Sequence, residues 1–225
     1  MNKCEERIKM AYYQDPFLKK IKDLEVSLEK DSIDLNFIGI DPGFQNMGSV
    51  VAHVTGNHKK RELVMHIKPE DMRSDYVMDP TGSIQVMQNR ILAWAYTRWT
   101  STEKLSDHMV VIEEQYFNPR GSYVAVSHNL ARLSDTLYNV FSLEMKSPTK
   151  LNNSRKLKSH FGIASNNHDN NKKLAVQKCH ELFPCLKELK FEHHVADALL
   201  QIVFWLNSYF GGYKIKLEIL TNKKQ

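Results

Sequence analysis

Two short apolar runs each end in an acidic residue, and this pattern most strongly limits what the chain can fold into. Residues 37–40 lead into Asp41, and residues 110–112 lead into Glu113. Runs of this length and composition are typical of buried strands. In open α/β sheets, ligands bind in the crevice beyond the carboxyl ends of the strands. The sequence therefore predicts a sheet that presents two carboxylates near a ligand crevice.

Apolar periodicity predicts the elements around these two strands. Strands are expected over residues 37–41, 47–54, 61–67 and 109–114, with a fifth short strand over 140–147. Helices are expected over residues 83–98, 123–139, 171–183 and 193–209. Residues 148–171 are polar and rich in asparagine, so they are expected to form a mobile loop. This order favours one α/β domain, a mixed five-stranded sheet flanked by helices.

An amphipathic segment precedes the first predicted strand. Asp15 and Pro16 fit the N-cap and first turn of a helix. Its apolar stripe consists of Leu18, Ile21, Leu24 and Leu28. The expected organisation is an N-terminal helical extension over 1–36, a main domain over 37–212 and a basic C-terminal tail over 213–225.

Length and composition exclude several classes of protein. The 225 residues suffice for one domain and a short appendage. No segment approaches the ~20 consecutive apolar residues of a membrane span, and the charged N-terminus does not resemble a secretory signal. The three cysteines show no metal-binding spacing, so reduced thiols are expected. The sequence thus predicts an intracellular protein in a reducing compartment, without contact with membranes.

Positive charge is concentrated in one region. The net charge is +5, and residues 146–190 contain ten lysines or arginines against three acids. Such a stripe is typical of a surface that binds a polyanion. A solvated lysine-rich loop has the same composition, so charge alone leaves both interpretations open.

A third acid completes a candidate metal site. Asp197 lies in the first turns of the last predicted helix, and His194 precedes it by three positions, on the same side of that helix. Clustered carboxylates repel one another unless a proton or a divalent cation relieves the repulsion. Oxygen-only ligands favour Mg²⁺ or Mn²⁺. Two such ions about 4 Å apart promote in-line displacement at a phosphodiester.

Three sequence blocks resemble a known family. Residues 37–43, 111–115 and 194–199 are similar to the signature blocks of RuvC-type Holliday-junction resolvases in the ribonuclease H-like superfamily, closest to the poxvirus and mitochondrial branch. The resemblance covers residues 37–209 and implies a ribonuclease H-like fold. It also implies a homodimeric, metal-dependent, structure-specific endonuclease. Such an enzyme resolves four-way junctions by paired nicks through two-metal-ion phosphodiester hydrolysis.

The resemblance also implies a role for individual residues. Asp41, Glu113 and Asp197 would bind two Mg²⁺ or Mn²⁺ ions per active site, and His194 would occupy the fourth catalytic position, where many relatives carry an acid. Glu114 points to the opposite side of its strand from Glu113. The partner implied is branched DNA, with no small-molecule cofactor. The candidate phosphate contacts are Lys146, Lys150, Arg155, Lys156, Lys158, Lys172 and Lys173.

Two other functions compete with this interpretation. The histidine at position 194 is compatible with a catalytically silent DNA-binding module of the same fold. Residues 41–43, with Gly48 shortly after them, also resemble the first phosphate loop of actin-like and sugar-kinase-like ATP-binding proteins. That class normally needs two such domains, and this chain has room for one.

Overall fold

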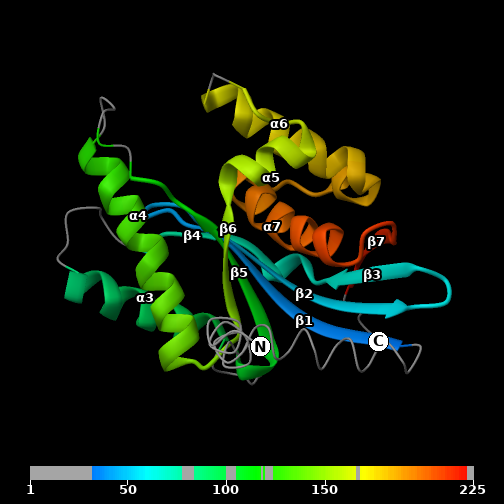
Figure 1. Ribbon diagram of the computed structural model, residues 1–225, viewed down its shortest axis with the longest axis horizontal. Helices are drawn as coiled ribbons and strands as arrows, with labels where there is room; N and C mark the ends of the chain where they lie inside the picture. The colour runs from blue at the N-terminus through cyan, green and yellow to red at the C-terminus, as the bar shows by residue number, and fades with distance from the viewer. Residues whose placement is uncertain are drawn as a thin grey trace, which may run out of the picture.

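The computed structural model of the chain describes residues 32–77, 84–99, 105–117, 119, 124–165 and 168–221. These residues form one mixed sheet with helices on both faces (Figure 1). The mixed α/β architecture predicted from the sequence is confirmed. The predicted helix within residues 1–36 falls largely outside the described residues, and the first strand already begins at Ser32.

The sheet combines an antiparallel meander with parallel strands. The meander consists of β1 (Ser32–Asp41), β2 (Met47–Asn57) and β3 (Glu62–Ile67). Strand β5 (His108–Glu114) runs parallel to β1, and β6 (Thr149–Asn153) runs parallel to β5. The strand order is β6-β5-β1-β2-β3-β7, and β4 (Met72–Asp75) pairs with β2. Ile40 lies opposite Ile112, so β1 and β5 end side by side.

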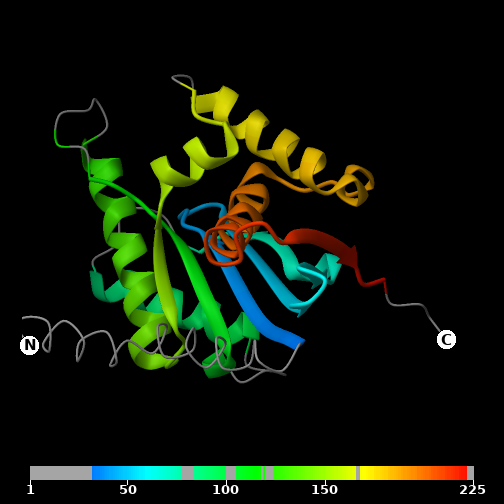
Figure 2. The same cartoon turned by 45° about the vertical axis from the view of Figure 1, so that its right-hand side comes forward.

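Helices cover the two faces of the sheet. One face carries α3 (Ile84–Trp99) and α4 (Val124–Asn139), and the other carries α7 (His193–Tyr209). Helices α5 (Ser154–Phe161) and α6 (His168–Leu182) also lie on the α7 side, and Figure 2 shows α6 outside α7. Short helical turns are η1 (Pro69–Asp71), η2 (Leu105–Asp107), η3 (Val140–Glu144) and η4 (Pro184–Glu188). None of the described helices is long and apolar enough to cross a lipid bilayer.

Strand β1 supplies side chains to the cores on both faces. Phe37 is fully buried on the α7 face, where its ring centroid lies 5.1 Å from that of Trp205. Ile38 and Ile40 are fully buried on the opposite face, in the core that includes Leu133 of α4. Full burial of such side chains contributes about 1.5–3 kcal/mol each. This two-sided burial explains why the strand reads as a continuous apolar run rather than an alternating one.

Two glycines allow α7 to lie close to the sheet. A Cβ atom at Gly39 would lie 2.2 Å from the carbonyl oxygen of Ala198, and one at Gly48 would lie 2.1 Å from that of His194. Only glycine permits such an approach of one backbone to another. The N-terminal part of α7 is thereby held against the strands that surround Asp41.

Two sequence-based predictions in the middle of the chain are wrong. Residues 140–144 form a π-helical continuation of α4 rather than a strand, because Val140 and Phe141 bury their side chains in the α4 face of the core. Residues 148–171 are not a loop without regular structure, because they contain β6, α5 and the start of α6. The Asn153 side chain caps α5 by accepting a hydrogen bond from the Lys156 amide at 3.0 Å.

The sheet is also larger than predicted, with seven strands rather than five. Strand β4 was not expected, and part of the predicted basic tail forms strand β7 (Lys214–Ile219), parallel to β3. Alternate residues of β7, including Leu217, are partly buried against the α7 core. Lysines alternate with these apolar residues and obscure the strand in the sequence.

Candidate functional site

Three carboxylates from separate elements meet in one cleft. Asp41 ends β1, Glu113 lies near the end of the adjacent parallel strand β5, and Asp197 projects from α7. All three line a cleft of about 320 Å³. The structure thus brings together the three acids that the sequence singled out.

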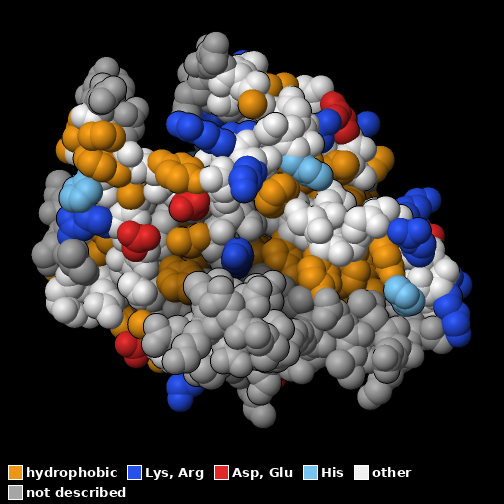
Figure 3. All heavy atoms as spheres, viewed as in Figure 1, with side chains coloured by type: hydrophobic (Ala, Val, Ile, Leu, Met, Phe, Trp, Pro, Cys, Tyr) orange, Lys and Arg blue, Asp and Glu red, His pale blue; other side chains and the backbone are white. Residues whose placement is uncertain are grey.

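The cleft opens to solvent between the helices at one end of the sheet. Leu130 of α4 lines one side of it, and Lys158 of α5 and Lys172 of α6 line the other. In the space-filling view the molecule is hollowed between the projecting end of α4 and the helices α5 and α6, and Lys or Arg side chains are exposed on the α6 side (Figure 3). A polyanion entering this hollow would meet basic groups before it reached the carboxylates.

The three carboxylates are buried close together, and their mutual repulsion is only partly compensated by the protein. Burial raises the pKa of Asp41 well above its ordinary value, and the neighbouring Glu113 raises it further. Burial also raises the pKa of Asp197, to which the charges of Asp41 and Glu113 add. Lys158 opposes both shifts without cancelling them. Such a site favours the uptake of a proton or a cation.

His194 contacts Asp41 directly. Its Nδ1 lies 2.7 Å from Oδ2 of Asp41. This distance is also that of an ion pair, but burial lowers the pKa of His194 while it raises the pKa of Asp41. Both shifts favour the neutral forms, so the contact is best described as a hydrogen bond that holds one proton between the two groups. The predicted fourth position of the site is therefore occupied by a side chain that orients Asp41.

Lys158 is the cation of the cluster. Its Nζ lies 3.4 Å from Oε1 of Glu113, and the Glu113 side chain is only 5% exposed. Burial by itself lowers the pKa of Lys158, but the charges of Glu113, Asp197 and Asp41 outweigh that effect and raise it. Lys158 was predicted to contact DNA phosphates, whereas the structure places it among the carboxylates.

The two adjacent glutamates of β5 have different surroundings. Glu113 is buried and lines the cleft, while Glu114 is half-buried and accepts a hydrogen bond from the Tyr116 hydroxyl at 2.5 Å. The strand alternation therefore directs Glu113 into the site, as expected from the sequence. Arg155 lies over the Tyr116 ring, 5.9 Å from its centroid, so Glu114 belongs to a separate polar group outside the carboxylate cluster.

The donor set fits a divalent cation. Among the described residues, no three histidine, cysteine or carboxylate side chains already stand in metal-ligand geometry around one point. The chemistry is nevertheless suitable, because Asp41, Glu113 and Asp197 offer oxygen donors in one buried, electronegative cleft. Mg²⁺ and Mn²⁺ prefer such hard oxygen ligands. Lys158 and Lys172 carry less charge than three ionised carboxylates, and a divalent ion would offset the remainder.

The predicted phosphate contacts do not form one continuous stripe. Lys172 lines the cleft, and the exposed Lys173 follows it on α6. Arg155 and Lys156 are exposed on α5, next to the end of β6 that lies beside Glu113. Lys150 is exposed within β6, and Lys146 precedes the opposite end of that strand, away from the carboxylates.

The cleft includes further residues that the sequence did not single out. Its remaining polar lining consists of Gln115, Ser154, Asn171 and His193. Gln115 follows the β5 carboxylates directly, and Asn171 belonged to the segment predicted as a loop. Gln115 was part of the resolvase-like block 111–115 without a role of its own, and the signal for His193 was its adjacency to His194 along the chain.

Comparisons with known proteins give alignments to solved structures at low sequence identity. No protein-family profile and no curated protein sequence matches the chain. The structure of RuvC from Thermus thermophilus aligns with a TM-score of 0.47 and 16% identity, over 80% of this chain and 99% of that one. RuvC from the same organism in complex with a Holliday junction substrate aligns with a TM-score of 0.48 and 18% identity, over 80% and 99%. The yeast mitochondrial Holliday junction resolvase Ydc2 aligns with a TM-score of 0.44 and 14% identity, over 80% and 83%.

These three alignments have identities of 14–18% and TM-scores below 0.5, so neither the family nor the function of the chain follows from them. The function must follow from the side chains of the cleft.

Proposed function

We propose that this protein is a divalent-metal-dependent endonuclease that acts on branched DNA and resolves four-way junctions. The observation that carries the proposal is the convergence of buried Asp41, Glu113 and Asp197 in one cleft with basic groups at its side. Carboxylates in this arrangement suit phosphodiester hydrolysis, in which negative charge builds up on the reacting phosphate. The RuvC-like sequence blocks support DNA as the substrate.

The three carboxylates would hold Mg²⁺ or Mn²⁺, with two ions in each site. Once bound, these ions supply charge stabilisation for the reacting phosphodiester and make an attacking water more acidic. The role of Asp41, Glu113 and Asp197 is to fix the ions at the bottom of the cleft, where burial limits screening by solvent.

Other side chains of the cleft position these groups and the DNA. His194 holds Asp41 through its 2.7 Å hydrogen bond and lies where it can take up a proton at the imidazole. Lys158 places its Nζ 3.4 Å from Oε1 of the buried Glu113 and so holds that side chain in the cleft. Lys172, at the side of the cleft, is placed to bind a phosphate of the approaching strand.

Paired nicks require two such clefts. The carboxylate cleft of one chain is built from that chain's own residues, so we propose that the active form is a homodimer with two such clefts. A two-fold axis would fix the spacing of two identical sites and of their basic sides. This fixed spacing, rather than base contacts, would then favour a four-way junction over a linear duplex.

A catalytically silent DNA-binding module is the second candidate, and one observation favours it. Asp41 is engaged by His194, and Glu113 is engaged by Lys158, so two of the three carboxylates have protein partners. In such a module the cleft would bind phosphates through its lysines without cleavage. Metal dependence separates the two candidates.

The deciding experiment is strand-resolved nicking of an immobile four-way junction. Each of the four strands is labelled in turn, and the purified full-length protein is incubated with Mg²⁺, with Mn²⁺ or with EDTA. We expect nicks in two opposing strands that require the metal, and little cleavage of a linear duplex of the same sequence. Intact junction binding with no turnover in either metal would favour the silent module.

A further inference from the structure

A second pocket lies between strand β4 and helix α3, outside the carboxylate cleft. Its volume is about 320 Å³. Three arginines line it: Arg73 from β4, and Arg90 and Arg98 from α3. The aromatic side chains of Tyr76 and Trp94 also line it. The pocket thus combines cationic and aromatic groups on two adjacent elements.

The positive charge of this pocket exceeds its negative charge. Asp75 is the single acid among the described lining residues. Its carboxylate is already engaged, because Arg73 Nη2 lies 3.2 Å from Oδ1 and Trp94 Nε1 donates to Oδ2 at 3.1 Å. Asp71, outside the lining, also acts on Arg98, so two carboxylates stand against three guanidinium groups and an added anion would still be attracted.

The guanidinium group of Arg98 has an incomplete set of hydrogen bonds. Its Nη2 donates to the carbonyl oxygen of Glu70 at 3.2 Å, but its buried Nε has no hydrogen-bond partner among the described residues. Burial lowers the pKa of Arg98, and the nearby charge of Arg73 lowers it further, while Asp71 and Asp75 oppose the shift without cancelling it. A phosphate oxygen would supply the missing acceptor for Nε and would add negative charge beside the three guanidinium groups.

The pocket is connected to the carboxylate cleft through the strands. Strand β4 pairs with the start of β2, where Asp75 lies opposite Met47. The amide of Val77 donates to the carbonyl oxygen of Phe44 at 3.0 Å, and Phe44 follows Gly43, which lines the cleft. Residues 42–46 therefore link the lining of the cleft to the strand that carries Asp75 and Arg73.

We propose that this pocket binds a phosphodiester of an unpaired DNA strand that continues from the cleft, with an adjacent base stacked on an aromatic ring. Arginine clusters recognise phosphate, and accessible aromatic rings stack on unpaired bases irrespective of sequence. Tyr76 is 63% exposed, which suits such stacking. The volume lies at the small end of ligand pockets, which hold ~300–1,000 Å³, and thus suits one nucleotide unit. The inference rests on the proposed function, which makes DNA the ligand.

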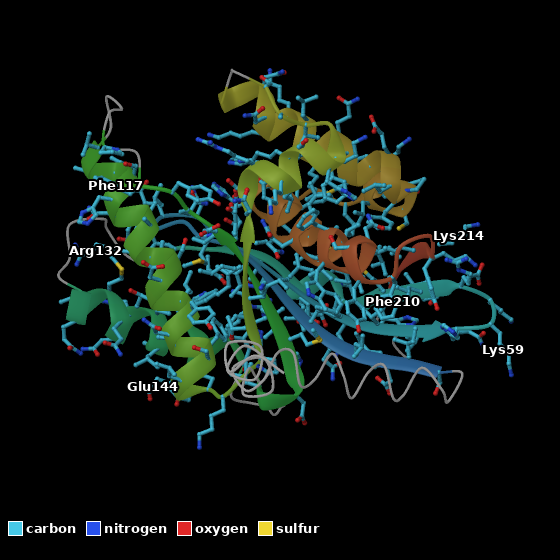
Figure 4. The ribbon with its side chains drawn as sticks, in the orientation of Figure 1. Lys59, Phe117, Arg132, Glu144, Phe210 and Lys214 are labelled. Atoms are coloured by element: carbon cyan, nitrogen blue, oxygen red, sulfur yellow. The ribbon has the colours of Figure 1, made fainter. Side chains whose placement is uncertain are left out.

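The test compares two double variants with equal loss of charge. Arg73→Gln with Arg90→Gln changes the pocket, and Lys59→Gln with Lys60→Gln changes the β2–β3 hairpin, which is distant from it (Figure 4). The probe is a fluorescent oligothymidylate, titrated at several salt concentrations. Loss of one single-strand phosphate contact reduces the slope of log affinity against log salt by about 0.7. We expect this reduction, with about tenfold weaker binding, only in the arginine variant.

Further measurements separate the possible ligands and a folding defect. Thermal melts establish that the variants are folded, and Arg90→Gln alone provides a version that leaves the Arg73–Asp75 pair in place. Thymidine monophosphate is titrated as a competitor. If thymidine monophosphate bound as tightly as the oligothymidylate and displaced it, the pocket would be a site for free nucleotides. The proposal would then be overturned. An equal loss of affinity in both double variants would also overturn it.

Failure of the pocket and failure of the proposed nuclease function give different results. Junction cleavage by the unaltered protein is measured separately from oligothymidylate binding. Absent cleavage with a selective defect in the arginine variant would overturn the nuclease function and retain the pocket. Normal cleavage with no selective defect would retain the nuclease function and overturn the pocket.

Discussion

Lys158 on α5 places its Nζ 3.4 Å from Oε1 of Glu113 on β5, across 45 positions of the sequence. The contact joins the short helix that follows β6 to the carboxylate cluster at the end of the neighbouring strand. Lys158 therefore acts as a built-in counter-charge to the acids that would hold a metal. Its position gives the protein a way to tolerate the cluster before a metal binds.

Substitution of Lys158 by glutamine should destabilise the metal-free protein and make it more dependent on metal. The change leaves the buried Glu113 carboxylate without its cation, which costs about 1–3 kcal/mol. We expect a lower melting temperature in EDTA and a larger rise on addition of Mg²⁺ than in the unaltered protein. Lys156→Gln, on an exposed position of the same helix, is the matched control. Equal melting temperatures of the two variants, with and without Mg²⁺, would show that Lys158 is not the counter-charge of the carboxylates.

Asp41→Asn, Glu113→Gln and Asp197→Asn should each abolish junction cleavage while junction binding stays roughly intact. Removal of one carboxylate takes away charge stabilisation at the reacting phosphate, which corresponds to a rate loss of about 10² or more. The same change weakens repulsion between the cleft and DNA phosphates. Single-turnover cleavage and gel-shift titration measure the two effects. Near-normal turnover in any variant would exclude that residue from the site.

Glu114→Gln is the control for the choice between the two β5 glutamates. Glu114 bonds to the Tyr116 hydroxyl rather than lining the cleft, so its substitution should have a much milder effect than that of Glu113. Equal losses in the two variants would show that the assignment of Glu113 is wrong.

The central fold and the acids of the site could be predicted because their signals are local. The apolar runs before Asp41 and Glu113 are buried on both sides and therefore stand out in the sequence. His194 and Asp197 share one side of a helix, and their spacing alone indicates this. The sequence gives no sign that Gly39 and Gly48 are packing positions, and the close approach of α7 explains them.

The missed features depend on tertiary contacts. Helix α5 buries only Leu157 and Phe161, so its eight residues read as a polar loop. Strand β7 requires the edge of β3 as a partner, and its lysines resemble those of a solvated tail. Lys158 was grouped with the phosphate-binding lysines because charge patterning cannot show that it faces Glu113. Sequence periodicity indicates which face of a helix or strand is apolar. It does not show which residues pack against that face, and the roles of α5, β7 and Lys158 depend on those residues.

The metal-free protein should lose stability as the pH rises. The pKa values of Asp41 and Asp197 are raised in the native state, first by burial and then by neighbouring carboxylates. Above the unfolded value of ~3.9, the native state binds more protons than the unfolded chain, so the free energy of unfolding falls until the pH passes the raised native pKa. Urea titrations in EDTA across this range should show the fall, and Mg²⁺ should reverse it at neutral pH.

The same variants that abolish cleavage should reduce this pH dependence. Asp41→Asn and Asp197→Asn each remove a carboxylate with a raised pKa, so the metal-free variants should be more stable than the unaltered protein at neutral pH. Asp135→Asn, on the exposed side of α4, is the control. If the metal-free protein instead gained stability with rising pH, the pKa values of Asp41 and Asp197 would not be raised in the native state.

Neutralisation of Lys172 and Lys173 together should weaken DNA binding without altering dimerisation. Lys172 lines the cleft, and Lys173 is exposed beside it on α6. Each lysine that neutralises a phosphate releases counterions, so the double glutamine variant should reduce the salt slope of junction binding by about two. The matched control is Lys214→Gln with Lys216→Gln on β7, at the far edge of the sheet (Figure 4). Salt titrations use the junction and a linear duplex of the same sequence, because a symmetric dimer should prefer the junction. An unchanged slope, or equal affinity for both DNAs under competition, would exclude this side of the cleft as the element that recognises the junction.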